Sequence, residues 1–237
     1  MTTTELQHRI AACPWPAVHD DLHARGVAVL PQVLDARARA ALRASYESGD
    51  FRSRVVMERH NFGRGEYKYF AYPLPPLVQE LRESLYQRLV PVAEQWSSAL
   101  ALPGKLPGAH AEFLARCRLA GQPRPTPLLL RYGAGDYNCL HQDLYGRISF
   151  PLQAVFLLSE PGTDFDGGEL MLVEQRPRMQ SRGIVVPLRA GDAAVFATSH
   201  RPAQGKRGFY RVAMRHGVSE IRSGERLTLG IIFHDAA

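Results

Sequence analysis

The sequence has few of the features typical of membrane, secreted or disulfide-rich proteins. No apolar run reaches the roughly 18 residues that a bilayer-spanning helix needs. The segment Met1–Ile10 is polar and lacks the apolar region of a signal peptide. The cysteines Cys13, Cys117 and Cys139 are odd in number and lack Cys-x-x-Cys spacing. We therefore expect a cytoplasmic protein with reduced thiols and no membrane contact, in which Cys139 is a small buried apolar residue.

Lysine is also scarce, although the chain is basic. Lys68, Lys105 and Lys206 are the only lysines in a chain with a formal net charge of +6, so arginine carries nearly all of the positive charge. This balance is compatible with binding to nucleic acid or to an acidic protein, and equally with a solvated basic surface. The sequence contains no glycine-rich phosphate loop and no apparent Ser/His/Asp nucleophile spacing.

The pattern of apolar segments predicts a mainly β (α+β) fold. The chain of 237 residues is 45% hydrophobic, which is enough for one sizeable core. Residues 1–125 predict a helical support region, with helices over 5–24, 36–47, 77–100 and 110–120, a strand over 26–30 and a hairpin within 55–72. Residues 126–237 predict short strands over 128–132, 148–158, 168–173, 183–188, 193–197, 210–217 and 226–233. We expect one compact domain, a double-stranded β-helix (jelly roll) braced by N-terminal helices.

The stretch from Arg131 to Asp143 carries the strongest chemical signal. It follows an apolar strand, turns through two glycines and ends on His141-Gln-Asp143. Because side chains alternate along a strand, His141 and Asp143 are expected to direct an imidazole and a carboxylate toward one point. A lone His-x-Asp is weak evidence, since surface turns of this composition are commoner. Two histidines and one carboxylate are the ligand set of non-haem Fe(II) oxygenases, so a second histidine decides the interpretation.

Several segments, taken in order, resemble those of the Fe(II)/2-oxoglutarate-dependent oxygenases in their prolyl-4-hydroxylase-like branch. They lie within roughly the last 110 residues, and the ordered set is far more specific than any single motif. They are Tyr132…Gly135…Tyr137…His141-x-Asp143, Gly167-Gly168-Glu169-Leu170, Gly191-Asp192 and His216…Gly224-x-Arg226. More narrowly, residues 141–146, 174–182, 215–219 and 232–235 resemble a bacterial group named for oxidative dealkylation of damaged DNA.

This resemblance implies Fe(II) as cofactor and 2-oxoglutarate and O₂ as cosubstrates. His141, Asp143 and His216 would hold the iron. Arg226 would form a bidentate contact with the distal carboxylate of 2-oxoglutarate. Tyr132 is expected to donate a hydrogen bond from its hydroxyl to the same carboxylate, and Thr228, on the same strand face as Arg226, is a weaker candidate.

Three further histidine and carboxylate positions compete for roles in the site. His200 is a rival third ligand, but it lies in an Arg/Gly/Pro-rich segment and lacks an arginine at the offset that Arg226 has from His216. We therefore expect His216 to be the ligand. His234 and Asp235 are candidates for contacts near the metal or substrate, although exposed C-terminal residues are the preferred interpretation.

The substrate is open between alkylated nucleic acid and a protein or peptide. We expect two segments to flank the iron and contact the substrate, with the nucleic acid slightly favoured by the resemblance and the basic charge. Their residues are Tyr67, Lys68 and Tyr69 in the hairpin, and Arg176, Arg178 and Arg182 farther along. An amphipathic hairpin that only covers the core is the alternative for the first segment. A non-catalytic cupin-like metal-binding or sensor domain is the rival for the whole chain.

Overall fold

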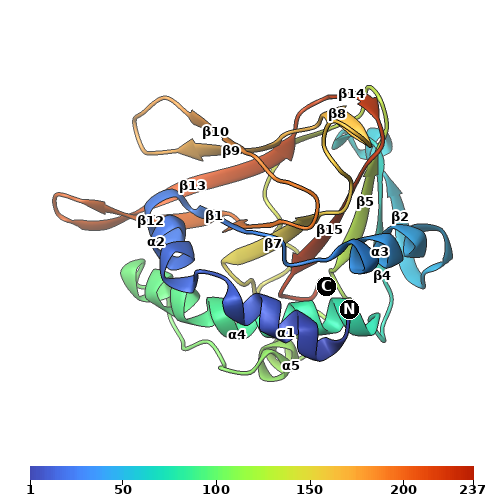
Figure 1. Cartoon of the computed structure of the whole chain (residues 1–237). Coiled ribbons are helices and arrows are strands. Elements are labelled where there is room, and N and C mark those ends of the chain that lie inside the picture. Colours follow the sequence, from blue (N-terminus) through green and yellow to red (C-terminus); the bar gives the residue numbers. More distant parts are fainter.

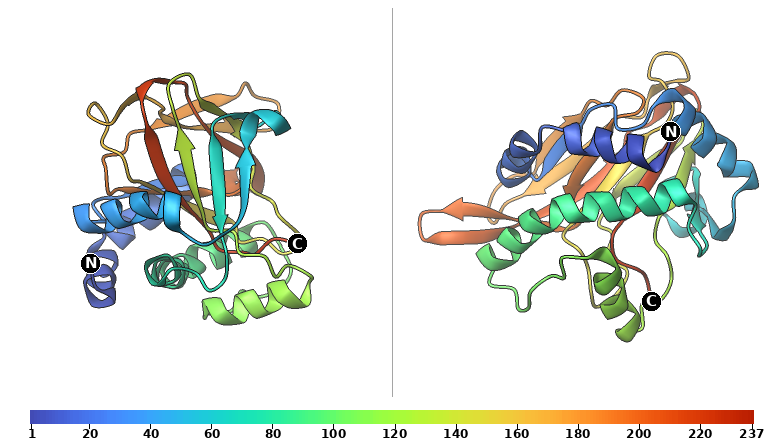
Figure 2. Two further views of the ribbon diagram at one scale, coloured as in Figure 1. Left: turned by 90° about the vertical axis from the view of Figure 1, so that its right-hand side faces the viewer. Right: turned by 60° about the horizontal axis from the view of Figure 1, so that its bottom comes forward.

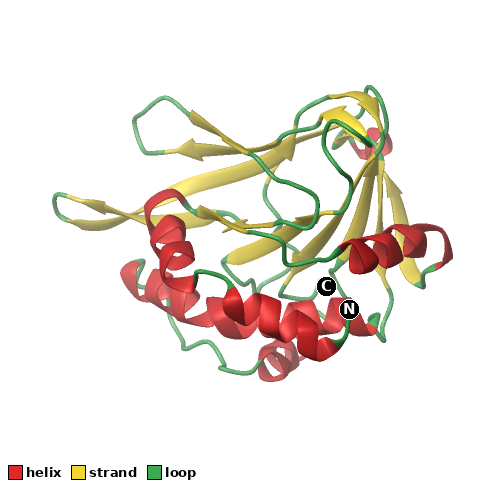
Figure 3. Cartoon of the chain, viewed as in Figure 1, coloured by secondary structure: helices red, strands yellow, loops and turns green.

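The computed structural model describes residues 1–237 as two large facing antiparallel sheets and a separate two-stranded sheet, with helices along one side (Figures 1 and 3). The helices are α1 (Thr3–Ala12), α2 (Trp15–Arg25), α3 (Ala36–Ser48), α4 (Pro76–Ala99), α5 (His110–Leu119) and the short 3-10 helix η1 (Met57–His60). The strands are β1 (Val27–Leu30), β2 (Phe51–Val56), β3 (Gly63–Arg64), β4 (Glu66–Phe70), β5 (Leu128–Tyr132), β6 (Tyr137–His141), β7 (Leu152–Leu157), β8 (Phe165–Gly167), β9 (Leu170–Gln175), β10 (Arg182–Val186), β11 (Ala193–Ala197), β12 (His200–Gly205), β13 (Gly208–Val218), β14 (Ile221–Gly224) and β15 (Arg226–Ile232). None of the helices combines the length and the apolar character that a membrane span requires.

The two sheets have the arrangement of a jelly roll, which confirms the predicted fold class. The seven-stranded sheet has the order β1-β11-β7-β15-β5-β4-β2, and the six-stranded sheet contains β10-β9-β13-β6-β3 with β12 paired to β13. Strands β1, β2 and β4 of the N-terminal region are therefore part of the larger sheet. The boundary expected between residues 1–125 and 126–237 falls between β4 and β5, which are hydrogen-bonded neighbours in this sheet.

The N-terminal helices form where the sequence predicts them, because most begin with a capping side chain or a proline in the first turn and each buries one apolar stripe. Asp35 caps α3, and its carboxylate accepts a hydrogen bond of 2.7 Å from the backbone N–H of Ala38. The predicted helix over 5–24 is divided at Cys13 and Pro14 into α1 and α2. Helix α4 continues through Pro91 and runs beside α1 beneath the sheets (Figure 2). Its buried stripe includes Val78, Leu81, Leu85, Leu89, Val92 and Trp96.

Strand β15 shows how the hydrophobic core and the cavity share one sheet. All of its residues are buried, but alternate side chains face opposite ways. Leu227, Leu229 and Ile231 belong to the main hydrophobic core. The residues between them face the cavity and are Arg226, Thr228, Gly230 and Ile232. The strand therefore presents a charged group to the cavity while its other face packs against apolar residues.

Four short strands, β6, β8, β12 and β14, were not predicted. Strand β6 lies between β3 and β13, and β12 pairs with β13 from His200 to Gly205. Each is short and contains polar, Gly or Pro residues, so hydrophobic periodicity does not reveal them. Cys139 on β6 is exposed, which corrects the expectation that it is buried. Cys139 lines the cavity and is not part of the hydrophobic core.

Candidate active site

The facing sheets enclose a cavity of about 390 Å³ that contains the predicted iron ligands. Strand β15 contributes one wall, and β6 and β13 contribute the side that carries the two histidines. His141 and His216 are directly opposite each other in the β6–β13 ladder. Their ring centroids are 4.2 Å apart. Residues that are 75 positions apart in sequence (216 − 141) are thus brought together by sheet register.

Asp143 completes a compact set of three metal-ligand groups with the two histidines. Potential ligand atoms of His141, Asp143 and His216 all lie within 4.8 Å of one another. The carboxylate Oδ2 of Asp143 is 3.1 Å from Nε2 of His216, and Oδ1 is 3.6 Å from Nε2 of His141. Strand β6 ends at His141, so Asp143 lies just beyond the strand and still points to the same place.

The electrostatics of these groups suit a divalent cation. Burial opposes ionisation of Asp143, but the two imidazoles and hydrogen bonds from His216 and Tyr145 hold the pKa of this carboxyl well below its usual range. Burial and the neighbouring His216 lower the pKa of His141, which favours the neutral imidazole. Nδ1 of His141 lies 2.7 Å from the carbonyl oxygen of Cys139. That contact assigns the proton to Nδ1 and leaves the Nε2 lone pair directed at the ligand cluster.

Arg226 is a buried cation without an anionic partner in the protein. Its side chain is 2% exposed, its Nε has no hydrogen-bond partner, and burial lowers its pKa to about 10. The rings of Tyr132 and Phe165 lie 5.7 and 5.9 Å from its guanidinium carbon. A buried charge is costly when unpaired, so this guanidinium is suited to receive a carboxylate ligand.

The glycine pair before β9 has a steric role beside Arg226. Gly168 adopts φ +62°, and a Cβ placed there would lie 2.9 Å from Cδ of Arg226 and 2.2 Å from Cδ1 of Ile221. Any side chain at this position would displace both residues. The Gly-Gly-Glu-Leu motif therefore provides space for the arginine as well as a turn.

Tyr132 and Thr228 lie in the same cavity as Arg226. Tyr132 pairs directly with Arg226 across the β5–β15 ladder and is fully buried. Its hydroxyl accepts a hydrogen bond of 3.1 Å from the side-chain amide of Asn138, and burial raises its pKa, so the hydroxyl keeps its proton. Thr228 is two positions beyond Arg226 and also lines the cavity. The sequence did not indicate a role for Asn138.

The hairpin residues divide between two faces of β4. Tyr67 and Tyr69 line the cavity, and their rings meet edge to face with centroids 5.3 Å apart. Lys68 points to the opposite face, where its Nζ donates a hydrogen bond of 2.7 Å to the carbonyl oxygen of Tyr46 and lies 4.2 Å from the centre of the Tyr46 ring. Lys68 is therefore remote from the cavity, because adjacent strand residues alternate sides.

The three arginines of the β9–β10 segment do not line the cavity. Arg176 donates a hydrogen bond of 2.6 Å to the buried carboxylate of Glu174, which is also paired with Arg201. Arg178 and Arg182 are exposed and form no ion pair. Their hairpin extends away from the body of the molecule (Figure 1).

His200 and His216 occupy clearly different places. His200 is half-buried at the start of β12, with its Nδ1 3.1 Å from the hydroxyl of Ser199. It does not line the cavity and does not join the ligand cluster. The structure therefore brings His216, and not His200, to His141 and Asp143.

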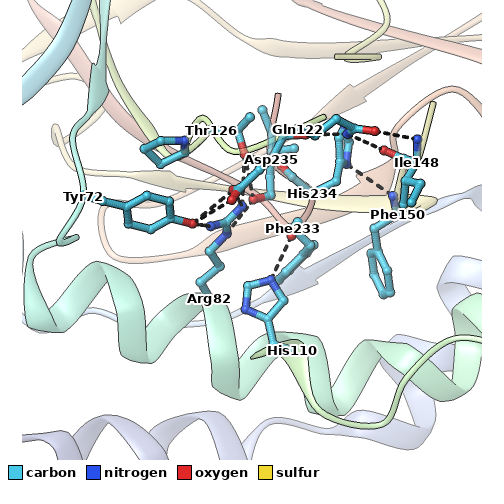
Figure 4. Close-up of polar contacts among 12 residues, drawn as sticks. Tyr72, Arg82, His110, Gln122, Thr126, Ile148, Phe150, Phe233, His234 and Asp235 are labelled. Atoms are coloured by element: carbon cyan, nitrogen blue, oxygen red, sulfur yellow. Dashed lines mark hydrogen bonds and ion pairs between the residues drawn. The ribbon is translucent and has the colours of Figure 1, made fainter. Parts of the chain in front are cut away.

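His234 and Asp235 are fully buried, which corrects the expectation of exposed C-terminal residues. Asp235 forms an ion pair of 2.8 Å with the buried guanidinium of Arg82 (Figure 4). The Nδ1 of His234 accepts a hydrogen bond of 3.2 Å from the backbone N–H of Phe150. His110 is also buried, and its Nε2 lies 2.8 Å from the carbonyl oxygen of Phe233. These residues anchor the end of the chain beneath the sheets.

Comparison with known proteins identifies the family. The model of the family Oxygenase-NA, described as an oxygenase catalysing oxidative methylation of damaged DNA, matches residues 65–236. Two uncharacterized proteins of Mycobacterium tuberculosis, MT2286 of strain CDC 1551 / Oshkosh and Rv2227 of strain ATCC 25618 / H37Rv, are each 49% identical to this chain over 168 residues. The aligned part is 71% of this chain and 72% of each relative.

Solved structures with the same fold are oxygenases of low sequence identity. An oxidoreductase of the 2OG-Fe(II) oxygenase family from Burkholderia pseudomallei has a TM-score of 0.57 at 17% identity, covering 95% of this chain and 94% of its own. A Pseudomonas putida prolyl-4-hydroxylase has a TM-score of 0.52 at 18% identity, covering 94% and 99%. A Trichoplax adhaerens prolyl hydroxylase, solved with a hypoxia inducible factor peptide fragment, has a TM-score of 0.53 at 17% identity, covering 98% and 93%.

The matched family model spans most of the chain, and the fold and the His-Asp-His cluster agree with it. Family membership implies Fe(II), 2-oxoglutarate and O₂ as cofactor and cosubstrates. The chain belongs to the Oxygenase-NA family and is a 2-oxoglutarate/Fe(II) oxygenase.

Proposed function

We propose that the protein is a dioxygenase that hydroxylates a C–H bond of an alkylated nucleic-acid base. One atom of O₂ enters the C–H bond as a hydroxyl group, and the other enters succinate as 2-oxoglutarate loses CO₂. After hydroxylation of an N-alkyl carbon, the C–N bond breaks, the alkyl group leaves as an aldehyde and the base nitrogen regains a proton. The observation that carries this proposal is the convergence of His141, Asp143 and His216 in a cavity that also holds the unpaired Arg226.

The three converging side chains fit a bound Fe(II). Two imidazoles and one carboxylate on one side of a metal leave its other positions open, which is the arrangement of non-haem Fe(II) oxygenases. When bound, the iron supplies the activation of O₂ that C–H hydroxylation requires. The protein holds Nε2 of His141 and the Asp143 carboxylate toward the same point, and the Cys139 carbonyl orients the His141 ring.

Arg226, Tyr132 and Thr228 are proposed to bind 2-oxoglutarate. The distal carboxylate would neutralise the Arg226 guanidinium, which has no anion of its own in the cavity. The protonated hydroxyl of Tyr132 is available as a further donor, and Thr228 offers a third hydroxyl on the same wall. Charge-assisted contacts of this kind are strongest where water is excluded.

The preference for nucleic acid is supported by the family description and by charge. The matching family is described as acting on damaged DNA, and the chain has a formal net charge of +6. Arg178 and Arg182 are exposed without acidic partners and are proposed to contact phosphates. Tyr67 and Tyr69 line the cavity and are proposed to stack on an extruded base or to contact it through their hydroxyls.

A second candidate function is hydroxylation of a protein or peptide. It is favoured by the similarity of fold to prolyl hydroxylases, one of which was solved with a peptide fragment. An extended peptide would be held by backbone hydrogen bonds, so its binding should depend less on salt than the binding of a phosphate chain.

The experiment is a measurement of succinate release from 2-oxoglutarate under O₂ with Fe(II). We expect methylated single-stranded DNA to stimulate release more than the same unmethylated DNA or a proline-containing peptide. The His216→Ala variant is the background control, because it removes a proposed metal ligand. Stimulation by peptide alone would replace the nucleic-acid proposal by the second candidate. Metal binding without any succinate would favour a non-catalytic metal-binding or sensor domain.

A further inference from the structure

Tyr145 makes a direct contact with the carboxylate of Asp143 that the resemblance did not assign. Its side chain lines the cavity, and its hydroxyl donates a hydrogen bond of 2.5 Å to Oδ1 of Asp143. The other carboxylate oxygen, Oδ2, lies 3.1 Å from Nε2 of His216. The two oxygens of one carboxylate therefore face different neighbours.

The direction of the hydrogen bond from Tyr145 is set by the ionised carboxylate of Asp143, which can only accept. The hydroxyl of Tyr69 donates a hydrogen bond of 3.2 Å to the hydroxyl of Tyr145. A phenol has one hydrogen to donate, so the Tyr145 hydroxyl donates its hydrogen bond to Asp143 and accepts one from Tyr69. The resulting chain from Tyr69 through Tyr145 to Asp143 has a single polarity.

The backbone that carries Tyr145 is held by the end of the chain. The backbone N–H of Ala237 donates a hydrogen bond of 3.1 Å to the carbonyl oxygen of Tyr145. The Tyr145 and His234 rings have centroids 6.0 Å apart. Farther along, the side chain of Gln122 donates to the carbonyl oxygens of Ile148 and of Asp235 at 2.9 and 2.6 Å (Figure 4). The C-terminal segment thus braces the loop that leads from Asp143 to β7.

We propose that Tyr145 is a positioning residue that holds Oδ1 of Asp143 and thereby presents Oδ2 as the single carboxylate ligand of the metal. This inference rests on the proposed use of Asp143 as an iron ligand. A hydrogen bond to one oxygen makes that oxygen a poorer ligand and fixes the plane of the carboxylate. The contacts of this loop with the C-terminal segment keep the tyrosine in place, so the carboxylate is oriented before metal arrives.

The test is the affinity of the protein for Co(II), a spectroscopically visible substitute for Fe(II), measured anaerobically without 2-oxoglutarate. Tyr145→Phe should weaken Co(II) binding by roughly tenfold to a hundredfold, the usual effect of removing an outer hydrogen bond to a metal ligand. Its Co(II) absorption bands should also change in intensity, because a released carboxylate can bind through both oxygens. Tyr69→Phe is the matched control and should stay within about threefold of the wild type, since it leaves the bond to Asp143 intact.

A double-mutant cycle separates a specific role from general damage. If Tyr145 acts only through Asp143, adding Tyr145→Phe to Asp143→Ala should not weaken Co(II) binding further. An equal loss in both backgrounds, or a Tyr145→Phe variant with wild-type affinity and wild-type bands, would overturn the inference and leave the proposed function standing. A wild-type protein that binds no Co(II) would overturn the proposed function first, and the inference with it.

Discussion

The two ends of the cavity solve opposite electrostatic problems. At one end the Asp143 carboxylate has two imidazoles and the Tyr145 hydroxyl around it. At the other end the Arg226 guanidinium is buried beside aromatic rings, without an anion. The first end has its charge partly compensated by the protein, while the second is compensated only when a ligand arrives. Burial of the Arg226 guanidinium without an anion therefore destabilises the folded protein, and a bound carboxylate would offset that loss of stability.

Removal of a ligand at the compensated end should have the largest effect. Wild-type protein purified without air should bind about one Fe(II) ion per chain. The variants His141→Ala, Asp143→Ala and His216→Ala should each bind less Fe(II) and have no turnover. His200→Ala is the matched control, since His200 lies outside the cavity. Iron content by metal analysis and succinate release by chromatography are the two measurements. Loss of iron in His200→Ala, with iron kept in His216→Ala, would mean that His200, and not His216, is the third metal ligand.

Removal of the uncompensated cation should be the next largest effect. Arg226→Ala should weaken 2-oxoglutarate binding at least tenfold, or about 1.4 kcal/mol, because the distal carboxylate loses its cation. Metal binding should survive, which distinguishes this end of the cavity from the other. Lys68→Ala removes a positive charge on the outer face of β4 and serves as control. Calorimetric titration of the metal-loaded protein gives both affinities, and equal values for Arg226→Ala and wild type would exclude Arg226 from the site.

The buried histidines near the chain end should make stability depend on acid. Burial lowers the pKa of His110 to about 3 and that of His234 to about 4, from the usual 6.5 of a solvated histidine. The unfolded chain therefore binds more protons between these values, so stability is fully present above pH 6.5 and decreases as the pH falls below it. Each histidine contributes a slope of up to about 1.4 kcal/mol per pH unit. Urea unfolding of wild type and His110→Phe over this range measures the slope, which should be flatter in the variant; parallel curves would contradict the assignment.

The smallest expected effects are on the exposed arginines. Arg178→Ala and Arg182→Ala should each lower the slope of log affinity against log salt by about one unit for methylated single-stranded DNA. Arg176→Ala offers a contrast, because Arg176 already pairs with Glu174 and its loss leaves that buried carboxylate with Arg201 alone. Arg176→Ala should therefore lower the thermal stability and leave the salt slope close to that of the wild type. Identical salt slopes in all three variants and wild type would remove this hairpin from the nucleic-acid interface.

The sequence predicts those parts of the site that follow from strand periodicity or motif order. Arg226 and Thr228 are two residues apart on one strand, so their common face is predictable from alternation alone. The pairing of His141 with His216 is not, because it depends on which strands become neighbours and on their register. Tyr67 and Lys68 show the same limit, since the hairpin was predicted but the face toward the cavity was not.

The C-terminal residues show a different limit of sequence reasoning. Polar residues near a chain end are usually exposed, and His234 and Asp235 are buried only because Arg82 on α4 and the backbone N–H of Phe150 provide partners. Those partners lie 153 and 84 residues away in sequence. No local pattern records such a pairing, so the support that this segment gives to the loop after Asp143 appears only in the folded chain.

The register of His216 opposite His141 also links metal supply to the lifetime of the protein. Their meeting exists only in the folded sheet, so the unfolded chain has no comparable site for the ion. Each occupied site therefore shifts mass action toward the folded state, by about 2.7 kcal/mol when free metal is a hundred times the dissociation constant. In iron-poor surroundings a larger fraction of the protein would be unfolded at any time, and proteases would degrade it faster. Iron abundance would then set how much of this enzyme persists, in addition to how fast each copy works.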